Sequence, residues 1–319
     1  MMTGCYKIPA VAFEQVMVFT NKMATDAYRG AGRPEAAFIA ERAIDLVAAE
    51  LGLDAVNVRL KNFVPKDAFP YTTATGLVYD SGDYPAALEK ALVNIDYKRV
   101  RAEQANARKN GRLVGVGISS YVEICGIGPS SMLPPGAQGW ESSTVRIEPD
   151  GKVTILTGIS PHGQGQETTF AQMAADALGI DIDDVTVIHG DTAIVQYGVG
   201  TFGSRGLTLG GTAMMMSISK LQDKLKKIAS AMMETPPEQL VFHNRTIALS
   251  ADLSQSAPLQ RVIAAAYDYK NPIPGMEPGL DATSFFEPTG CTFPFGTHIA
   301  VIEIDPQTGT LKFLRYVAV

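Results

Sequence analysis

The sequence predicts an α+β protein in which helices and strands alternate irregularly. Two candidate hairpins, about residues 149–151 and 306–309, indicate antiparallel strand pairing. Helical segments with a 3.6-residue period stand between the strands without the regular rhythm of a parallel sheet. With 319 residues, 46% of them hydrophobic, the chain has enough apolar material for one large or two ordinary domains.

Helices are predicted where apolar residues recur every three to four positions and suitable residues stand at the ends. The segment from Pro34 shows this best, because proline suits a first helical position and Gly52 follows its last turn. The predicted helices are 34–51, 53–63, 84–94, 96–109, 167–178, 207–234 and 258–268. Because the highly charged fourth helix ends at Asn110–Gly111, we expect one domain at 1–109 and a second at 110–319.

Strands are predicted where β-branched and alternating apolar residues are bounded by turn residues. The predicted strands are 8–20, 113–124, 144–148, 152–157, 185–189, 245–249, 298–304 and 310–319. The 30 glycines and 19 prolines predict long loops between these elements. The predicted loops are 21–33, 64–83, 126–139, 158–166, 190–206 and 271–280.

Charge and cysteine content exclude several functions. The 27 basic and 33 acidic residues leave a net charge of −6, which argues against a nucleic-acid or anionic-membrane partner. Three widely spaced cysteines cannot form a four-thiolate zinc or iron–sulfur site. The sequence has no run of about 18 apolar residues, so no membrane span is predicted. A cytoplasmic, thiol-reducing location is expected.

Two glycine loops carry the clearest functional signal. GQGQETT at 163–169 and GVGTFGSRG at 198–206 each run from a strand into a helix. Glycine lets backbone N–H groups approach a ligand closely, and a helix N-terminus attracts anions. A phosphate or an anionic cofactor is therefore the expected ligand.

Other interpretations of these loops remain open. Gly198, Gly200 and Gly203 fit the dinucleotide pattern G-x-G-x-x-G, but the residue twenty positions on, Asp223, lies inside a predicted helix instead of ending a strand. Nucleotide binding is thus a weaker alternative, and no phosphate-binding Gly-Lys-Ser/Thr occurs. The hydroxyl and amide side chains of the loops could also cap helices.

Isolated residues outside the loops are less informative. Arg29, in the loop AYRGAGR, could clamp a carboxylate or stabilise developing negative charge, although a surface arginine is the simpler interpretation. The four histidines have no metal-binding spacing. The nucleophile pattern G-x-S-x-G of serine hydrolases is absent.

Five longer segments together indicate a family. They are AYRGAGRPEA (27–36), NFVPKDAFPYTTATGLVYDSGDY (62–84), YVEICGIGPS (121–130), GQGQETTFAQMAADALG (163–179) and GTFGSRGLTLGG (200–211). In these segments and their order, the chain resembles the molybdopterin-binding large subunit of the xanthine dehydrogenase, aldehyde oxidase and carbon monoxide dehydrogenase family. The resemblance implies an elongated, two-domain α+β fold, with 1–109 belonging to the first cofactor-binding domain and a connector, and 110–319 to the second.

The resemblance also implies a cofactor, a reaction and site residues. Molybdenum–molybdopterin, or its cytosine dinucleotide form, would be held by Gly163, Gln164, Gly165, Gln166, Glu167, Thr168, Thr201, Phe202, Gly203, Ser204 and Arg205. Arg29 matches a catalytic arginine that orients substrate. The implied reaction is hydroxylation of an electron-poor C–H carbon of a small molecule with oxygen from water. Electrons would leave through iron–sulfur clusters and FAD on partner subunits or on the remaining pieces of the large subunit.

Two departures from the family pattern modify these expectations. Members that oxidise carbon monoxide have a cysteine after the arginine, where this chain has Gly30-Ala31-Gly32, so an aldehyde or an N-heterocycle is the expected substrate. The family's catalytic glutamate is expected beyond the apolar strand 315–319, and another cofactor loop is expected before residue 1. We therefore expect part of a longer or split subunit that is inactive alone, and a non-catalytic fragment or scaffold is the alternative.

Overall fold

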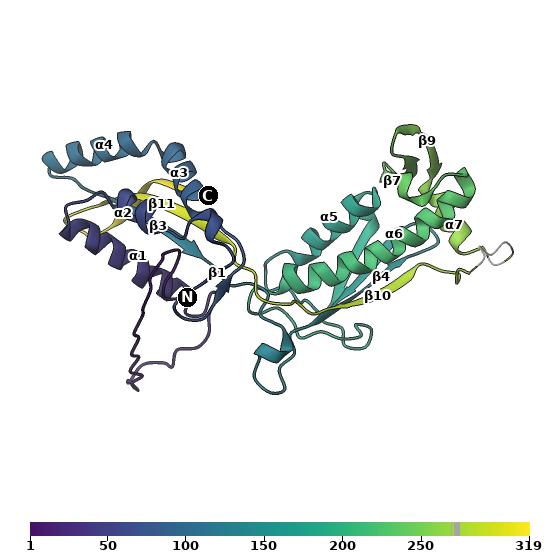
Figure 1. The fold of residues 1–319 in the computed structure, drawn as a ribbon, viewed down its shortest axis with the longest axis horizontal. Coiled ribbons are helices and arrows are strands. Elements are labelled where there is room, and N and C mark those ends of the chain that lie inside the picture. The colour runs from purple at the N-terminus through teal and green to yellow at the C-terminus, as the bar shows by residue number, and fades with distance from the viewer. Residues whose placement is uncertain (269, 271–274) are drawn as a thin grey trace. The chain divides into compact units, whose positions relative to one another are not determined.

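A computed structural model of the chain describes residues 1–268, 270 and 275–319. Unit 1 comprises residues 1–125 and 292–319, and unit 2 comprises 126–291 (Figure 1). Both contain mixed helices and sheets, so the predicted α+β class is confirmed. The compact units divide the chain at other positions than the boundary expected after residue 109, because the last two strands return to pair beside the strand that starts at Leu113.

Unit 1 contains an antiparallel sheet of order β12-β11-β3, with a short hairpin of β1 and β2. Its strands are β1 (Tyr71–Thr72), β2 (Val78–Tyr79), β3 (Leu113–Val122), β11 (Phe295–Ile304) and β12 (Leu311–Ala318). Its helices are α1 (Arg33–Glu50), α2 (Ala55–Asn62), α3 (Tyr84–Ile95) and α4 (Tyr97–Lys109), with a 3₁₀ turn at Lys66–Ala68. The helices predicted from residue 34 to residue 109 are therefore present with small shifts at their ends.

Local side chains explain where these helices begin. The Asp54 carboxylate accepts the Val56 N–H at 2.8 Å at the start of α2. The Asp83 carboxylate accepts the Ala86 N–H at 3.2 Å at the start of α3. Helix α1 instead begins with Pro34 in its first turn, as predicted. Each of these residues satisfies or removes an N–H group that has no partner inside the helix.

A buried ion pair covers the free edge of β3. Glu41 of α1 and Arg59 of α2 lie 2.9 Å apart, and both are almost fully buried. The Glu41 carboxylate accepts the Ser120 N–H at 2.8 Å, and Arg59 donates to the Ile118 carbonyl at 3.0 Å. The Tyr6 hydroxyl also donates to Glu41. The pair thus satisfies edge groups of the sheet that would otherwise be unpaired.

Unit 2 contains a four-stranded sheet of order β10-β4-β5-β6 and a smaller sheet of order β7-β8-β9. Its strands are β4 (Glu141–Ile147), β5 (Val153–Thr157), β6 (Val185–His189), β7 (Leu240–His243), β8 (Thr246–Leu249), β9 (Asp252–Pro258) and β10 (Asp281–Phe286). Its helices are α5 (Gln166–Leu178), α6 (Thr212–Met233) and α7 (Leu259–Ala266), with a π-helical turn at Gly206–Gly211 and 3₁₀ turns at Ser130–Met132, Ile182–Asp184 and Pro237–Gln239. The pair β5–β6 is parallel and the other pairs are antiparallel.

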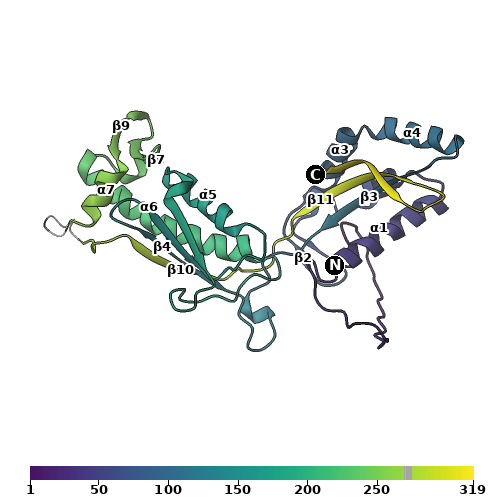
Figure 2. The same ribbon diagram turned by 180° about the vertical axis from the view of Figure 1, so that it is seen from behind.

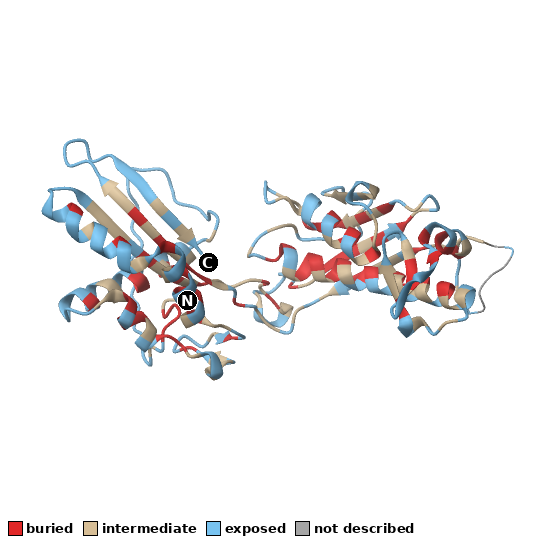
Figure 3. Cartoon of the chain, turned by 90° about the horizontal axis from the view of Figure 1, so that it is seen from above, coloured by how far each residue is buried: buried red, intermediate tan, exposed pale blue. Residues whose placement is uncertain are grey.

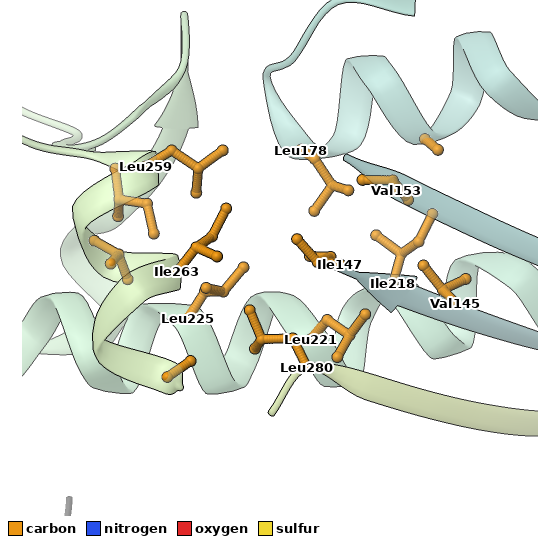
Figure 4. Close-up of a cluster of buried hydrophobic side chains, with 14 of the residues drawn as sticks. Val145, Ile147, Val153, Leu178, Ile218, Leu221, Leu225, Leu259, Ile263 and Leu280 are labelled. Carbon is orange, nitrogen blue, oxygen red and sulfur yellow. The ribbon is translucent and has the colours of Figure 1, made fainter. Parts of the chain in front are cut away.

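One hydrophobic core holds unit 2 together. Helices α5, α6 and α7 contribute Leu178, Ile218 and Ile263, which belong to one cluster of buried side chains with Val145 and Val153 of the sheet (Figure 4). Each fully buried aliphatic side chain of this kind contributes about 1.5–3 kcal/mol. Opposite views show α5 and α6 beside the sheet (Figures 1 and 2), and buried residues gather inside each unit (Figure 3). This core supports the sheet ends from which the glycine loops leave.

The prediction of a strand at residues 8–20 is wrong. This segment contains no strand, and its apolar side chains are exposed, with Val16 at 75% and Phe19 fully exposed. A β-prone sequence forms a strand only when a neighbouring strand accepts its N–H and C=O groups, and no described strand pairs with it. The sequence also did not reveal β7, β9 and β10.

The loop predicted at 271–280 lies partly outside the described residues, which do not include 271–274. Within the part of the chain that the structure describes, no helix is long and apolar enough to cross a membrane.

Candidate functional site

The first glycine loop leaves β5 and leads into α5. Gly163 and Gly165 have positive φ angles of 98° and 78°, and Gly165 is the N-cap of α5 without a side-chain cap. A Cβ atom added to either glycine would meet no heavy atom of the described residues within 4 Å. The start of α5 therefore has open space beside its glycines and no side-chain cap, which suits a helix N-terminus that binds a ligand.

The second glycine loop leads through the π-helical turn into α6. Gly200 has φ 84° and open space where a Cβ would lie, whereas Gly203 packs against Ile127. Ser204 adopts the left-handed region at φ 54°, which is uncommon for a residue with a side chain. π-helical turns within longer helices occur frequently at functional sites.

The two loops cross at the end of the sheet. A Cβ on Gly158 would lie 2.2 Å from the Gly198 Cα, and a Cβ on Gly198 would lie 2.1 Å from the Gly158 Cα. A Cβ on Gly206 would lie 3.3 Å from Nε2 of Gln166. Only glycine permits the approach of Gly158 and Gly198, so the loops that the sequence separates by about 35 residues lie together at one site.

Arg205 anchors the second loop from inside the protein. The residue is 1% exposed, and its side chain donates to the Glu141 carboxylate at 2.6 Å and to the Gly200 carbonyl at 2.9 Å. It also donates to the Trp140 carbonyl at 2.8 Å. The ring of Phe202 stands 5.3 Å from its guanidinium carbon. These polar partners all come from the protein itself.

Glu141 is a site residue that the sequence analysis missed. It is fully buried at the first position of β4, and its carboxylate also accepts the Ser142 N–H at 3.1 Å and the Val199 N–H at 3.4 Å. Alternation along β4 puts residue 141 on the same face as the core residues Val145 and Ile147. A charged residue at a core position of an alternating strand is the signal that could have revealed it.

Two buried polar atoms in the loops have no hydrogen-bond partner among the described residues. They are the amide oxygen Oε1 of Gln166 and the hydroxyl oxygen of Thr201. A buried polar atom without a partner is costly, so such atoms in a native protein call for a ligand or ordered water. The Gln166 oxygen can only accept, whereas the Thr201 hydroxyl can donate or accept. Together with the open glycines, they fit a polar cofactor that offers both donors and acceptors.

The remaining predicted residues of the first loop are exposed. The Gln164 side chain accepts the His162 N–H, and Thr168 stands in the first turn of α5. Glu167 lies 2.9 Å from Nε2 of His189, and this hydrogen bond lowers the pKa of the Glu167 carboxyl. The structure thus brings the predicted residues of both loops to one end of the sheet in unit 2.

Arg29 lies in unit 1, in the turn that precedes α1, and is exposed. Arg33 fixes this turn, because its Nε donates to the Gly30 carbonyl at 2.7 Å and its Nη1 donates to the Ile124 carbonyl at 2.7 Å. Arg33 also pairs with Glu123. The turn therefore holds Arg29 on a defined backbone while its side chain stays accessible.

The described part of the chain contains no cluster of metal-binding side chains. No set of three or more His, Cys, Asp or Glu side chains there could hold a metal ion.

Comparison with known proteins points in the same direction. Sequence profiles of the molybdopterin cofactor-binding domain match residues 1–63 and 90–319. The chain is 38% identical to the carbon monoxide dehydrogenase large chain of Hydrogenophaga pseudoflava, over 99% of this chain and 40% of that one. It is 32% identical to the nicotine 6-hydroxylase large subunit of Paenarthrobacter nicotinovorans, over 97% of this chain and 38% of that subunit.

Solved structures show a matching fold. Quinoline 2-oxidoreductase from Pseudomonas putida 86 matches with a TM-score of 0.89 and 34% identity, over 99% of this chain and 41% of that chain. Carbon monoxide dehydrogenase from Oligotropha carboxidovorans matches with a TM-score of 0.83 and 36% identity, over 92% and 37%. The chain spans about two fifths of the length of these relatives.

Proposed function

The chain belongs to the molybdopterin-binding large subunits of the molybdenum hydroxylase family, and from this premise we propose that its two glycine loops hold molybdenum–molybdopterin for the hydroxylation of a small-molecule C–H carbon. The unpartnered Gln166 oxygen and Thr201 hydroxyl carry the proposal, because they offer a polar ligand an acceptor and a donor inside converging glycine loops. The full set of residues proposed for the cofactor is Gly163, Gln164, Gly165, Gln166, Glu167, Thr168, Thr201, Phe202, Gly203, Ser204 and Arg205.

Each kind of residue has a distinct task. The N–H groups at the start of α5 meet negative charge, and open glycines such as Gly163 and Gly200 let the ligand approach the backbone. The Glu167 carboxylate is a hydrogen-bond acceptor at the exposed rim of the site, and its hydrogen bond with His189 lowers its pKa. When bound, the cofactor supplies two-electron oxidation and transfer of oxygen derived from water.

Arg29 is proposed to orient the substrate and to stabilise negative charge that develops on it. Its accessible guanidinium offers N–H donors in a planar fork, and the turn that carries it is held by Arg33. The sequence Gly30-Ala31-Gly32 after Arg29 offers no thiol. This supports an aldehyde or an N-heterocycle as the substrate, and among the relatives are a nicotine 6-hydroxylase and a quinoline 2-oxidoreductase.

Electrons are proposed to leave through iron–sulfur and FAD groups on partner subunits. The described part of this chain has no cluster of side chains able to hold such a metal centre, and its three cysteines are free. Free thiols also support a cytoplasmic location.

Metal and pterin analysis tests the cofactor proposal. The chain would be purified from cells that make molybdopterin, together with the subunits that copurify, and assayed for molybdenum and for pterin fluorescence. We expect both in a fixed ratio to the protein. A fully assembled complex without molybdenum or pterin would contradict the proposal and favour a non-catalytic scaffold.

Substrate oxidation tests the reaction. We expect the assembled complex to oxidise aldehydes or N-heterocycles such as quinoline, and Arg29→Ala to lower this activity at least tenfold while molybdenum content stays unchanged. Oxidation of carbon monoxide but not of these compounds would contradict the proposed substrate class.

A further inference from the structure

The second glycine loop rests on a buried ion pair of Glu141 and Arg205. Both residues are at most 1% exposed, and Nη1 of Arg205 lies 2.6 Å from the Glu141 carboxylate. The loop itself, by contrast, is half-buried or exposed at the neighbouring residues Val199 and Thr201. The buried Glu141–Arg205 ion pair therefore lies under residues 199–201, which belong to the loop proposed to bind the cofactor.

The pair fixes the backbone on the N-terminal side of Thr201. Arg205 binds the Gly200 carbonyl at 2.9 Å, and Glu141 accepts the Val199 N–H at 3.4 Å. Thr201 follows these two residues, and its hydroxyl is buried without a partner among the described residues. The two charged side chains thus set where that hydroxyl lies.

Neighbouring contacts make the arrangement rigid. Trp140, which precedes Glu141, stacks on Tyr197 with ring centroids 3.6 Å apart and an interplanar angle of 18°. Ser142, which follows Glu141, donates to the Tyr197 carbonyl at 2.7 Å. The start of β4 therefore holds the loop at three consecutive positions, residues 140–142.

We propose that Glu141 and Arg205 are positioning residues for the cofactor. The carboxylate neutralises the guanidinium inside the protein, and together they hold residues 199–201 in the conformation that presents the Thr201 hydroxyl and the loop N–H groups. Arg205 therefore contributes to cofactor binding through the loop that it holds. This inference rests on the proposed binding of molybdopterin.

A pair of double variants separates positioning from stability. Removing one member of a buried ion pair leaves an unpaired charge, whereas replacing both members with neutral groups restores much of the stability. Glu141→Gln combined with Arg205→Met tests the site. Glu41→Gln combined with Arg59→Met is the control, because that pair is also almost fully buried but lies in unit 1.

Both double variants are compared with wild type in the assembled complex purified from molybdopterin-producing cells. We expect both to melt closer to wild type than the single variants Glu141→Gln and Glu41→Gln do. The Glu141/Arg205 double variant should retain less than a tenth of the wild-type molybdenum and pterin, while the Glu41/Arg59 double variant retains wild-type amounts. Equal retention by both double variants would overturn the positioning role.

Hydrogen–deuterium exchange of cofactor-free wild-type protein tests the same idea without any substitution. If the pair preorganises the loop, the Val199 amide exchanges as slowly as amides of β4 before the cofactor binds. Exchange at the rate of an unstructured segment would overturn the inference. Absence of pterin from the wild-type complex would instead overturn the proposed function, and slow exchange of Val199 would then not rescue it.

Discussion

Glu41 and Glu141 are both buried against an arginine, yet the two ion pairs hold different parts of the backbone in place. Glu41 and Arg59 satisfy the edge of β3, whereas Glu141 and Arg205 hold a loop. Burial raises the pKa of Glu41 even though Arg59 opposes this effect. A buried charge is tolerated only with its partner, so each pair should respond strongly to the loss of one member.

Loss of Arg59 should therefore destabilise unit 1. We expect Arg59→Met to lower the free energy of unfolding by about 3–5 kcal/mol, because the Glu41 carboxylate stays buried without its cation. Chemical denaturation followed by circular dichroism measures this change. Arg112→Met is the control, because the Arg112–Glu303 pair lies at the surface and should contribute much less to stability. Similar losses for both variants would contradict the importance of burial.

The hydrogen bond between His189 and Glu167 should be visible in a titration. It lowers the pKa of Glu167, so we expect His189→Ala to return this pKa toward its ordinary value, as followed by NMR of the carboxyl carbon. A carboxyl with a lowered pKa stabilises the fold above its unfolded pKa, and this contribution disappears as the pH falls through the folded pKa. The stability difference between variant and wild type should therefore be present at neutral pH and vanish in acid.

A second histidine provides the control for that titration. The exposed His243 contacts Asn244 and not a carboxylate. His243→Ala should leave the Glu167 pKa unchanged. An unchanged Glu167 pKa in His189→Ala would show that the bond does not persist in solution.

Close backbone contacts at glycine residues bring the two loops together. The crossing of Gly158 and Gly198 brings two backbone segments closer than any side chain would permit. The π-helical turn packs in the same way, because a Cβ on Gly210 would lie 2.2 Å from Ile159. These contacts explain why two loops in different parts of the sequence act together.

Gly198→Ala should separate the two loops. The added methyl would meet backbone atoms of Gly158, which cannot rotate away, so we expect a loss of at least about 1–3 kcal/mol in unfolding free energy. Pterin content should fall as well. Gly290→Ala is the control, because a Cβ there meets no described atom within 4 Å and the backbone needs no positive φ. Wild-type stability and pterin content in Gly198→Ala would contradict the crossing.

Most helices, and the strands of the main sheets other than β10, were predictable, because the spacing of apolar residues and the residues at element ends act locally. Pro34 and Gly52, for example, bound α1 in the sequence as they do in the structure. The segment 8–20 was not predictable, because its strand-like alternation finds no neighbouring strand among the described residues. The glycine loops were recognisable by composition, but the buried Glu141–Arg205 pair depends on a contact across about 60 residues of sequence. No local pattern encodes that contact.

The whole chain consists of one unit inserted into another. Unit 2 occupies residues 126–291, and its two ends are joined by a short antiparallel bridge. The Cys125 N–H donates to the Thr292 carbonyl at 2.8 Å, and the Thr292 N–H donates to the Cys125 carbonyl at 3.0 Å. The two chain segments that lead into and out of unit 2 therefore pair with each other at Cys125 and Thr292.

This arrangement predicts that unit 2 folds without unit 1. Its core residues come from positions 145 to 280, so all of them are retained in a fragment of residues 126–291. We expect that fragment to show a cooperative thermal transition by circular dichroism and native-like mixed helix and strand content. Ile218→Ala in the fragment should lower the transition, because Ile218 is fully buried in that core. A fragment without a cooperative transition would contradict this independence.

The pairing of β3 with β11 also has a consequence for synthesis on the ribosome. Val122 pairs with Phe295, so the sheet of unit 1 cannot close until the whole of unit 2 has been translated. Chains emerge at about 5–20 residues per second, whereas local contacts form far faster, so the inserted segment has seconds in which to fold first. Once folded, it brings the two waiting strands together and removes most of the entropic cost of closing so long a loop. The order of residues along the chain thereby sets an order of folding, with the glycine loops of unit 2 formed before the sheet of unit 1 closes.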